Sequence, residues 1–123
     1  MAAGTSKSFS TATSPMFPSS PKKGVATGII INSTQSECDM LDISGYRFFA
    51  VKPSASVGTL TFYGSETSSG TYVLIDSIGT NGVVTIANAT RWVALDGTKL
   101  MPFSYIQMKS DQAAATASVC AST

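Results

Sequence analysis

From residue 25 onward, apolar and polar residues alternate with a period of two in short segments that end at turn-forming residues. In residues 59–63, for example, Leu60 and Phe62 fall on one face and the residues around them on the other. The same alternation, or a short apolar run, marks the segments 26–32, 38–43, 46–52, 72–77, 83–86, 91–96 and 103–109. A last segment, 113–119, is ambiguous, because its alanines favour a helix and its β-branched residues favour a strand. Its place after a series of strands leads us to expect one more strand.

Seven or eight short strands at a spacing of roughly ten residues are typical of an antiparallel sandwich or barrel. Beyond the ambiguous last segment, no stretch carries apolar residues at helical spacing over three turns, so no amphipathic helix is available to cover a single sheet. We therefore predict an all-β fold, an antiparallel β-sandwich with immunoglobulin-like or jelly-roll-like topology. The inward positions are expected at Phe48 or Phe49, Leu60, Phe62, Leu74 or Ile75, Val93, Leu95, Ile106 and Met108.

The first 24 residues differ from the rest in composition, with three spaced prolines, many Ser and Thr, three Lys and no acidic residue. Spaced prolines prevent a continuous helix and favour an extended course, and so few apolar groups cannot form a core. We therefore predict an extended Pro/Ser/Thr-rich arm over residues 1–24 and a β-sandwich domain over residues 25–123. We interpret the arm as a segment that docks on another subunit or another protein, with a flexible tail as the alternative. The candidate contact residues of the arm are Phe9, Met16, Phe17, Lys22 and Lys23.

Composition excludes several classes of function. The chain has no His, so the commonest general base and the commonest metal ligand are both missing. The net charge of +1 is too close to neutral for a protein held on nucleic acid mainly by phosphate contacts. No run of about 18 apolar residues suggests a membrane span. We expect no enzymatic activity, no cofactor, no direct nucleic-acid contact and no membrane contact. A surface rich in Ser and Thr and poor in charge suits a protein packed against neighbours.

The acidic residues and the cysteines are further candidate sites. Glu37, Asp39 and Asp42 form the main acidic cluster, which we interpret as a solvated edge, with a cation site as the alternative. Cys38 and Cys120 match no metal or redox spacing, so we expect two buried thiols, and a disulfide between them stays open.

Adjacent aromatic residues on a strand point to opposite faces, so one of Phe48 and Phe49 is expected in the core and the other at a contact. Tyr63 and Trp92 are the possible surface aromatics; each could also be part of the core.

Four segments, residues 58–65, 70–76, 91–96 and 105–110, resemble a pattern in small structural proteins of tailed bacteriophages, where a strand that ends in a Ser-rich hairpin precedes another strand. The resemblance covers about residues 45–110. It implies a non-enzymatic virion protein and supplies no functional residue.

We therefore expect a capsid decoration (cement) protein that binds and stabilises the lattice of the major capsid protein. The implied partners are the major capsid protein or other virion proteins and further copies of the chain, and the implied location is the capsid surface after synthesis in the host cytoplasm. The alternatives are a tail, baseplate or fibre component, or a carbohydrate-binding β-sandwich that stacks sugars on Tyr63 or Trp92.

Overall fold

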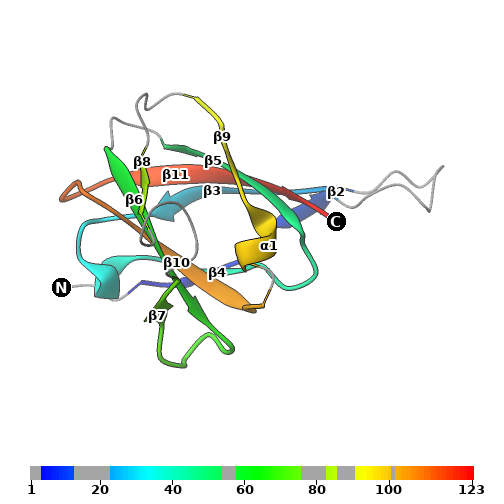
Figure 1. Ribbon diagram of the computed structural model, residues 1–123, viewed down its shortest axis with the longest axis horizontal. Helices are drawn as coiled ribbons and strands as arrows, with labels where there is room; N and C mark the ends of the chain where they lie inside the picture. The colour runs from blue at the N-terminus through cyan, green and yellow to red at the C-terminus, as the bar shows by residue number, and fades with distance from the viewer. Residues whose placement is uncertain (1–3, 13–22, 54–57, 76–82, 86–90, 101) are drawn as a thin grey trace.

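The computed structural model describes residues 4–12, 23–53, 58–75, 83–85, 91–100 and 102–123, and these form two β-sheets that share one core (Figure 1). Sheet A has the strand order β1-β4-β10-β6-β7, and β8 also pairs with β6. Its strands are β1 (Ser6–Lys7), β4 (Met40–Asp42), β6 (Thr59–Ser65), β7 (Val73–Leu74), β8 (Val83–Thr85) and β10 (Tyr105–Ser110).

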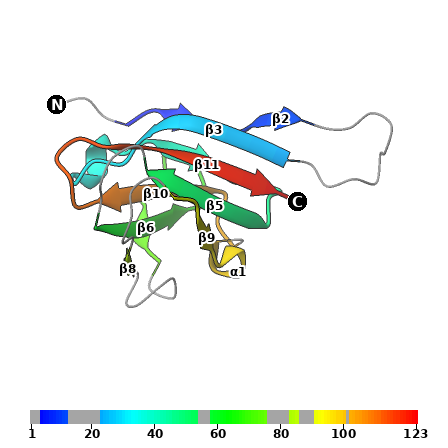
Figure 2. The same ribbon diagram turned by 90° about the horizontal axis from the view of Figure 1, so that it is seen from above.

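Sheet B has the strand order β2-β3-β11-β5-β9 and lies over sheet A (Figure 2). Its strands are β2 (Ser10–Ala12), β3 (Lys23–Ile30), β5 (Phe48–Pro53), β9 (Val93–Leu95) and β11 (Thr116–Ser122). Two single turns complete the described elements: the 3-10 turn η1 (Gln35–Glu37) and α1 (Gly97–Leu100). Strand pairing in the described residues is antiparallel except between β1 and β4. The predicted β-sandwich is confirmed, and so is the last strand, which is β11.

The core lies between the sheets and follows the alternation in the sequence. Leu60 and Phe62 of β6 are fully buried, and Phe49 of β5 is buried whereas Phe48 is 62% exposed. Ile75 is buried and Leu74 is exposed, so both of the alternatives left open by the sequence are resolved. Among the other predicted inward residues, Ile106 and Met108 are buried, and Val93 and Leu95 are partly buried against the core.

The predicted division between an arm and a sandwich needs correction. Strand β3 begins at Lys23, so a boundary after residue 24 would cut through a strand. The described part of the predicted arm, residues 4–12, belongs to the sandwich: β1 pairs with β4 in sheet A, and β2 pairs with β3 in sheet B. We call residues 4–12 the N-terminal strap. Because the strap contributes a strand to each sheet, it closes the same side of both (Figure 2).

A β-bulge interrupts the pairing of β3 with β11. Ala117 pairs with Ile29, but Val119 pairs with Ala26, so two residues of β3 oppose a single residue of β11. Gly28 lies in this bulge with a φ of 66°, a left-handed conformation that residues with a Cβ rarely adopt. The glycine therefore allows β3 to bend while both ends of the strand stay paired.

Candidate functional site

The structure places the predicted arm contacts in three different situations. Phe9 is 8% exposed and packs in the core of its own chain, with its ring centroid 4.7 Å from that of Tyr46 and 6.4 Å from that of Phe49. The ring of Phe9 therefore packs on its own sandwich, where the sequence led us to expect a surface of another molecule, because an aromatic ring gains free energy when it leaves solvent for an adjacent core. Lys23 is exposed at the start of β3. The remaining candidates, Met16, Phe17 and Lys22, lie outside the described residues.

A buried carboxylate fixes the strap to the sandwich. Asp39 is fully buried, and its Oδ1 accepts hydrogen bonds from the Thr5 backbone N–H and the Thr5 hydroxyl, both at 3.0 Å. Its Oδ2 accepts one from the Ile30 backbone N–H at 2.9 Å. A buried charge is tolerated only where such donors satisfy it, so Asp39 and the strap depend on each other.

The acidic cluster of the sequence is dispersed in the structure. Glu37 lies in η1 and accepts a hydrogen bond from the Asn32 side chain at 3.2 Å, and Asp42 accepts one from the Ser44 backbone N–H at 2.9 Å. Asp39 is fully buried, which corrects the interpretation of the cluster as a solvated edge, and each of the three carboxylates accepts hydrogen bonds from nearby groups of its own chain. Within the described ranges, no group of three or more potential metal-ligating side chains occurs.

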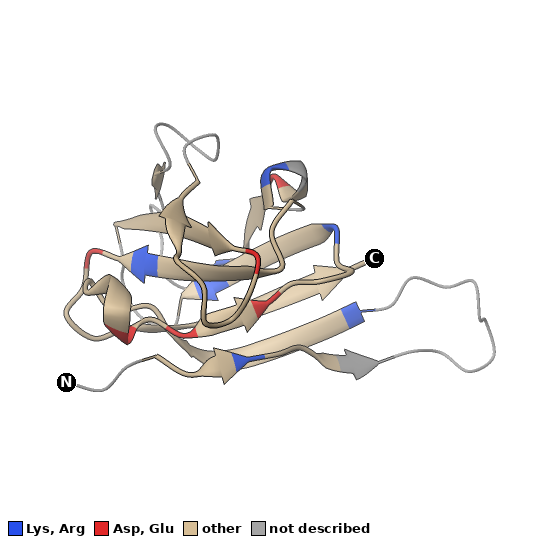
Figure 3. Cartoon of the chain, turned by 90° about the horizontal axis from the view of Figure 1, so that it is seen from below, with Lys and Arg blue, Asp and Glu red and all other residues tan. Residues whose placement is uncertain are grey.

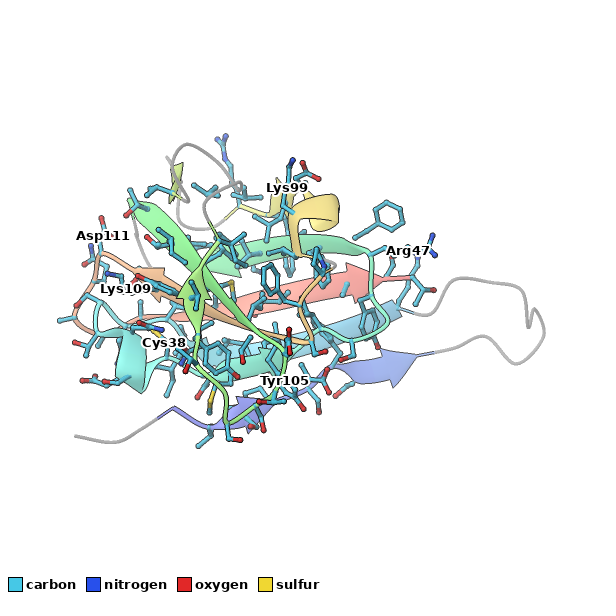
Figure 4. The ribbon with its side chains drawn as sticks, turned by 60° about the horizontal axis from the view of Figure 1, so that its bottom comes forward. Cys38, Arg47, Lys99, Tyr105, Lys109 and Asp111 are labelled. Carbon is cyan, nitrogen blue, oxygen red and sulfur yellow. The ribbon has the colours of Figure 1, made fainter. Side chains whose placement is uncertain are left out.

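Both cysteines are free thiols, and they differ in environment. Cys38 is fully buried, and burial raises its pKa to about 11, with a further increase from the negative charge of Asp39. The thiolate is the nucleophilic form, so Cys38 is unreactive at neutral pH. Figure 4 shows Cys38 at the same end of the sandwich as Lys109 and Asp111, far from Arg47. Cys120 is half-buried on β11, which corrects the expectation that both thiols are fully buried.

The outer face of sheet B is the best candidate for a binding surface. We call it the B face and define it by the residues that point away from the core on three adjacent strands: Val25 on β3, Cys120 and Ser122 on β11, and Phe48 and Ala50 on β5. Ser122 lies between the larger side chains of Lys23 and Phe48, and a trough of about 440 Å³ extends over this part of the sheet. Ser10 and Lys23 also line the trough. Phe48 and Val25, 62% and 42% exposed, are large apolar groups of the kind found at protein contacts.

The two predicted surface aromatics differ in exposure. Trp92, next to β9, is 46% exposed, and the Nζ atom of Lys52 lies 5.1 Å from its ring centroid, which is a cation–π contact. Tyr63 of β6 is half-buried between its cross-strand neighbours Gln107 and Leu74. Of the two, Trp92 therefore offers more free surface.

Charge does not single out another surface. Figure 3 shows acidic and basic residues scattered over the described elements, without an extended patch of one sign. Such a distribution favours contacts through apolar groups over binding to a polyanion. In the described part of the chain, no helix is long and apolar enough to cross a membrane.

The fold and the B face define a small β-sandwich protein with an exposed apolar sheet. No protein-family model matches the chain, and no curated protein matches it in sequence. Among solved structures, the chain is similar to the crystal structure of the SPBc2 prophage-derived protein YomS, with a TM-score of 0.55 and 18% sequence identity. The match covers 85% of this chain and 96% of that one, so nearly all of the YomS fold is present here.

The sequence predicted part of this site. The alternation predicted that one of Phe48 and Phe49 is buried and the other exposed, and the exposed ring is Phe48. It did not identify the trough. The signal for it is the row of small residues Ser118, Cys120 and Ser122 at alternate positions of β11, a face with no bulky side chain.

Proposed function

We propose that this chain is a non-enzymatic structural protein of a bacteriophage particle, and specifically a capsid decoration protein that binds and stabilises the lattice of the major capsid protein. The observation that carries the proposal is the similarity of fold to a prophage-derived protein over 96% of that protein's length. The pattern of the strands in the sequence resembles phage structural proteins independently of that comparison.

The geometry supports a role in protein contacts. The B face presents large apolar side chains, notably Phe48, around a trough whose floor is small and uncharged. Such a surface is suited to a complementary protein surface, because burial of each large apolar side chain contributes about 1.5–3 kcal/mol. Since Phe9 packs inside its own chain, we do not assign the contact with the particle to the described part of the strap.

The direct test is composition of the particle. Virions produced by the genome that encodes this chain are purified, and mass spectrometry measures the copy number of the chain relative to the major capsid protein. We expect a fixed ratio of the order of one per capsid subunit or per group of subunits. Immunogold microscopy should label heads; label on tails would favour the tail or fibre alternative, and absence of the chain from purified particles would refute the proposal.

Exposure of Trp92 supports a second candidate, a carbohydrate-binding module. Aromatic rings bind sugars by stacking, but Lys52 already lies over the Trp92 ring. A glycan array compares the protein with its Trp92→Ala variant. Binding that is lost in the variant would favour this candidate, whereas an array without signal removes it.

A further inference from the structure

The two halves of the B face, one on the β3 side of the sheet and one on the β9 side, are complementary to each other in charge and in side-chain size. One row of residues crosses three strands at the same level: Lys23 on β3, Ser122 on β11 and Phe48 on β5. Asp96, which is exposed, continues this row, because it follows Leu95 and Leu95 pairs with Phe49. In order across the sheet, the row therefore contains a basic residue, a small residue, a large aromatic residue and an acidic residue.

We propose that the B face is a self-association surface, on which a second copy of this chain docks so that Phe48 of each copy fills the trough of the other. The proposal concerns contacts between copies and does not rest on the proposed role in a phage particle.

The symmetry of the row carries the argument. A two-fold axis parallel to the strands, midway between β11 and β5, places Phe48 of each copy over Ser122 of the other. The same operation brings Lys23 opposite Asp96, so that unlike charges meet at both ends of the row. The two Phe48 rings become neighbours across the axis, an arrangement that contributes beyond the area it buries.

The next row along the strands fits the same axis. Cys120 pairs with Val25 on one side and with Ala50 on the other. The two-fold operation places Cys120 of each copy over Ala50 of the other, so two small side chains meet where the backbones must approach closely. Face-to-face sheets pack about 10 Å apart, which brings the two Cys120 thiols within reach of a short bismaleimide.

The two sheets differ in what covers them, which explains the choice of face. On sheet A, η1 is fixed to β10 by hydrogen bonds from the Gln107 side chain to the backbone carbonyls of Cys38 at 2.9 Å and Gln35 at 3.3 Å. Over β3, β11 and β5, the structure has the open trough of the B face. The exposed apolar side chains of sheet A, Val73 and Leu74, lie on the edge strand β7, whereas those of the B face surround the trough.

The size of the face sets the expected affinity. Strands lie about 4.8 Å apart and rise about 3.3 Å per residue, so three strands of about six residues and the three residues of β9 cover roughly 330 Å² on each copy. A stable specific interface buries about 800 Å² per partner. We therefore expect a reversible dimer, with a dissociation constant of about 10 μM to 1 mM.

Sedimentation equilibrium on the full chain over this range of concentration tests the proposal. We expect the mean mass to rise from 12.7 kDa toward twice that value. Phe48→Ser should weaken association by at least about tenfold, as expected of a central aromatic anchor. The matched control is Val73→Ser on sheet A, because Val73 is 61% exposed against 62% for Phe48. It should leave the dissociation constant unchanged within about twofold.

Cross-linking provides a second, geometric measurement. A short bismaleimide should join two copies through Cys120, and Cys120→Ser should abolish the product, since Cys38 is buried and protonated. A monomer at all concentrations, or a dimer that Phe48→Ser does not weaken, would overturn the proposal. So would protection of Cys120 from a monofunctional maleimide in the monomer, which would show that another segment of the same chain occupies the trough.

Discussion

Phe9 decides whether the N-terminal strap belongs to the fold of its own chain. The ring is 8% exposed, and it contacts Tyr46 and Phe49. Gly24 also lies against Phe9, since a Cβ added to Gly24 would lie 2.7 Å from the Phe9 Cβ. The substitution Phe9→Ala therefore removes a ring that is enclosed on several sides.

The cost can be estimated from these contacts. Loss of the buried ring costs about 2 kcal/mol of transfer free energy, and loss of the aromatic contact with Tyr46 about 1 kcal/mol more. Because the strap is at the side of the sandwich and can move inward, only part of the cavity penalty applies. We expect Phe9→Ala to lower the free energy of unfolding by about 3 kcal/mol.

Urea denaturation, followed by far-UV circular dichroism at low micromolar concentration, measures this loss. Phe48→Ala is the matched control, since it makes the same chemical change at a residue that is 62% exposed, and it should shift stability by no more than about 0.5 kcal/mol. A loss below about 1 kcal/mol for Phe9→Ala would refute the assignment of the strap to the core. It would restore the original prediction that this segment docks on another molecule.

Three further predictions follow from single residues. Asp39→Asn should lower the free energy of unfolding by about 1–3 kcal/mol in urea denaturation, because an amide cannot accept every hydrogen bond that the carboxylate accepts. Hydrogen exchange at the Thr5 backbone amide should accelerate in this variant. Unchanged exchange at Thr5 would contradict the anchoring role of Asp39. The pKa of the Cys38 thiol is raised from 9.0 to about 11, so the folded state binds this proton more tightly than the unfolded state does. The free energy of unfolding should therefore be retained below pH 9 and fall as the pH rises toward 11. Urea denaturation of Cys120→Ser, compared with a variant that also carries Cys38→Ser, measures this fall. A similar fall in both proteins would rule Cys38 out as the cause. Gly28→Ala should lower the free energy of unfolding by about 1–2 kcal/mol through backbone strain alone, since φ is 66° and nothing lies within 4 Å of the added Cβ. Gly28→Asn should lower it less, because asparagine adopts this left-handed conformation more readily than alanine.

Alternation in the sequence was sufficient to predict the sandwich because side chains in a strand change face at every residue. Leu60 and Phe62 illustrate this, and so does the choice between Phe48 and Phe49, which the alternation narrowed to one buried ring and one exposed ring. What alternation cannot give is which strands pair. β3 lies beside β11 although some 85 residues separate them, and that pairing creates the B face.

The strap could not be predicted for a related reason. Residues 6–7 and 10–12 are too short and too polar to carry a strand pattern of their own. Their place in the sheets depends on partners elsewhere, since Thr5 binds the carboxylate of Asp39 and Phe9 packs on Tyr46. Local composition indicated an extended segment correctly, but it could not show that the surface on which the segment lies belongs to the same chain.

The position of the strap also limits how copies of this protein can associate. Open sheet edges invite further strands to pair, and natural proteins protect them with short or covered edge strands. Here β1 and β2, of two and three residues, take the edge positions beside β4 and β3. Extension of either sheet on that side would offer a partner few backbone hydrogen bonds. Association through the B face uses side chains instead, and side-chain contacts depend on individual residues such as Phe48 in a way that backbone pairing does not. Reversible and specific contact between copies is therefore expected at the face of sheet B, while the strap keeps the neighbouring edges closed.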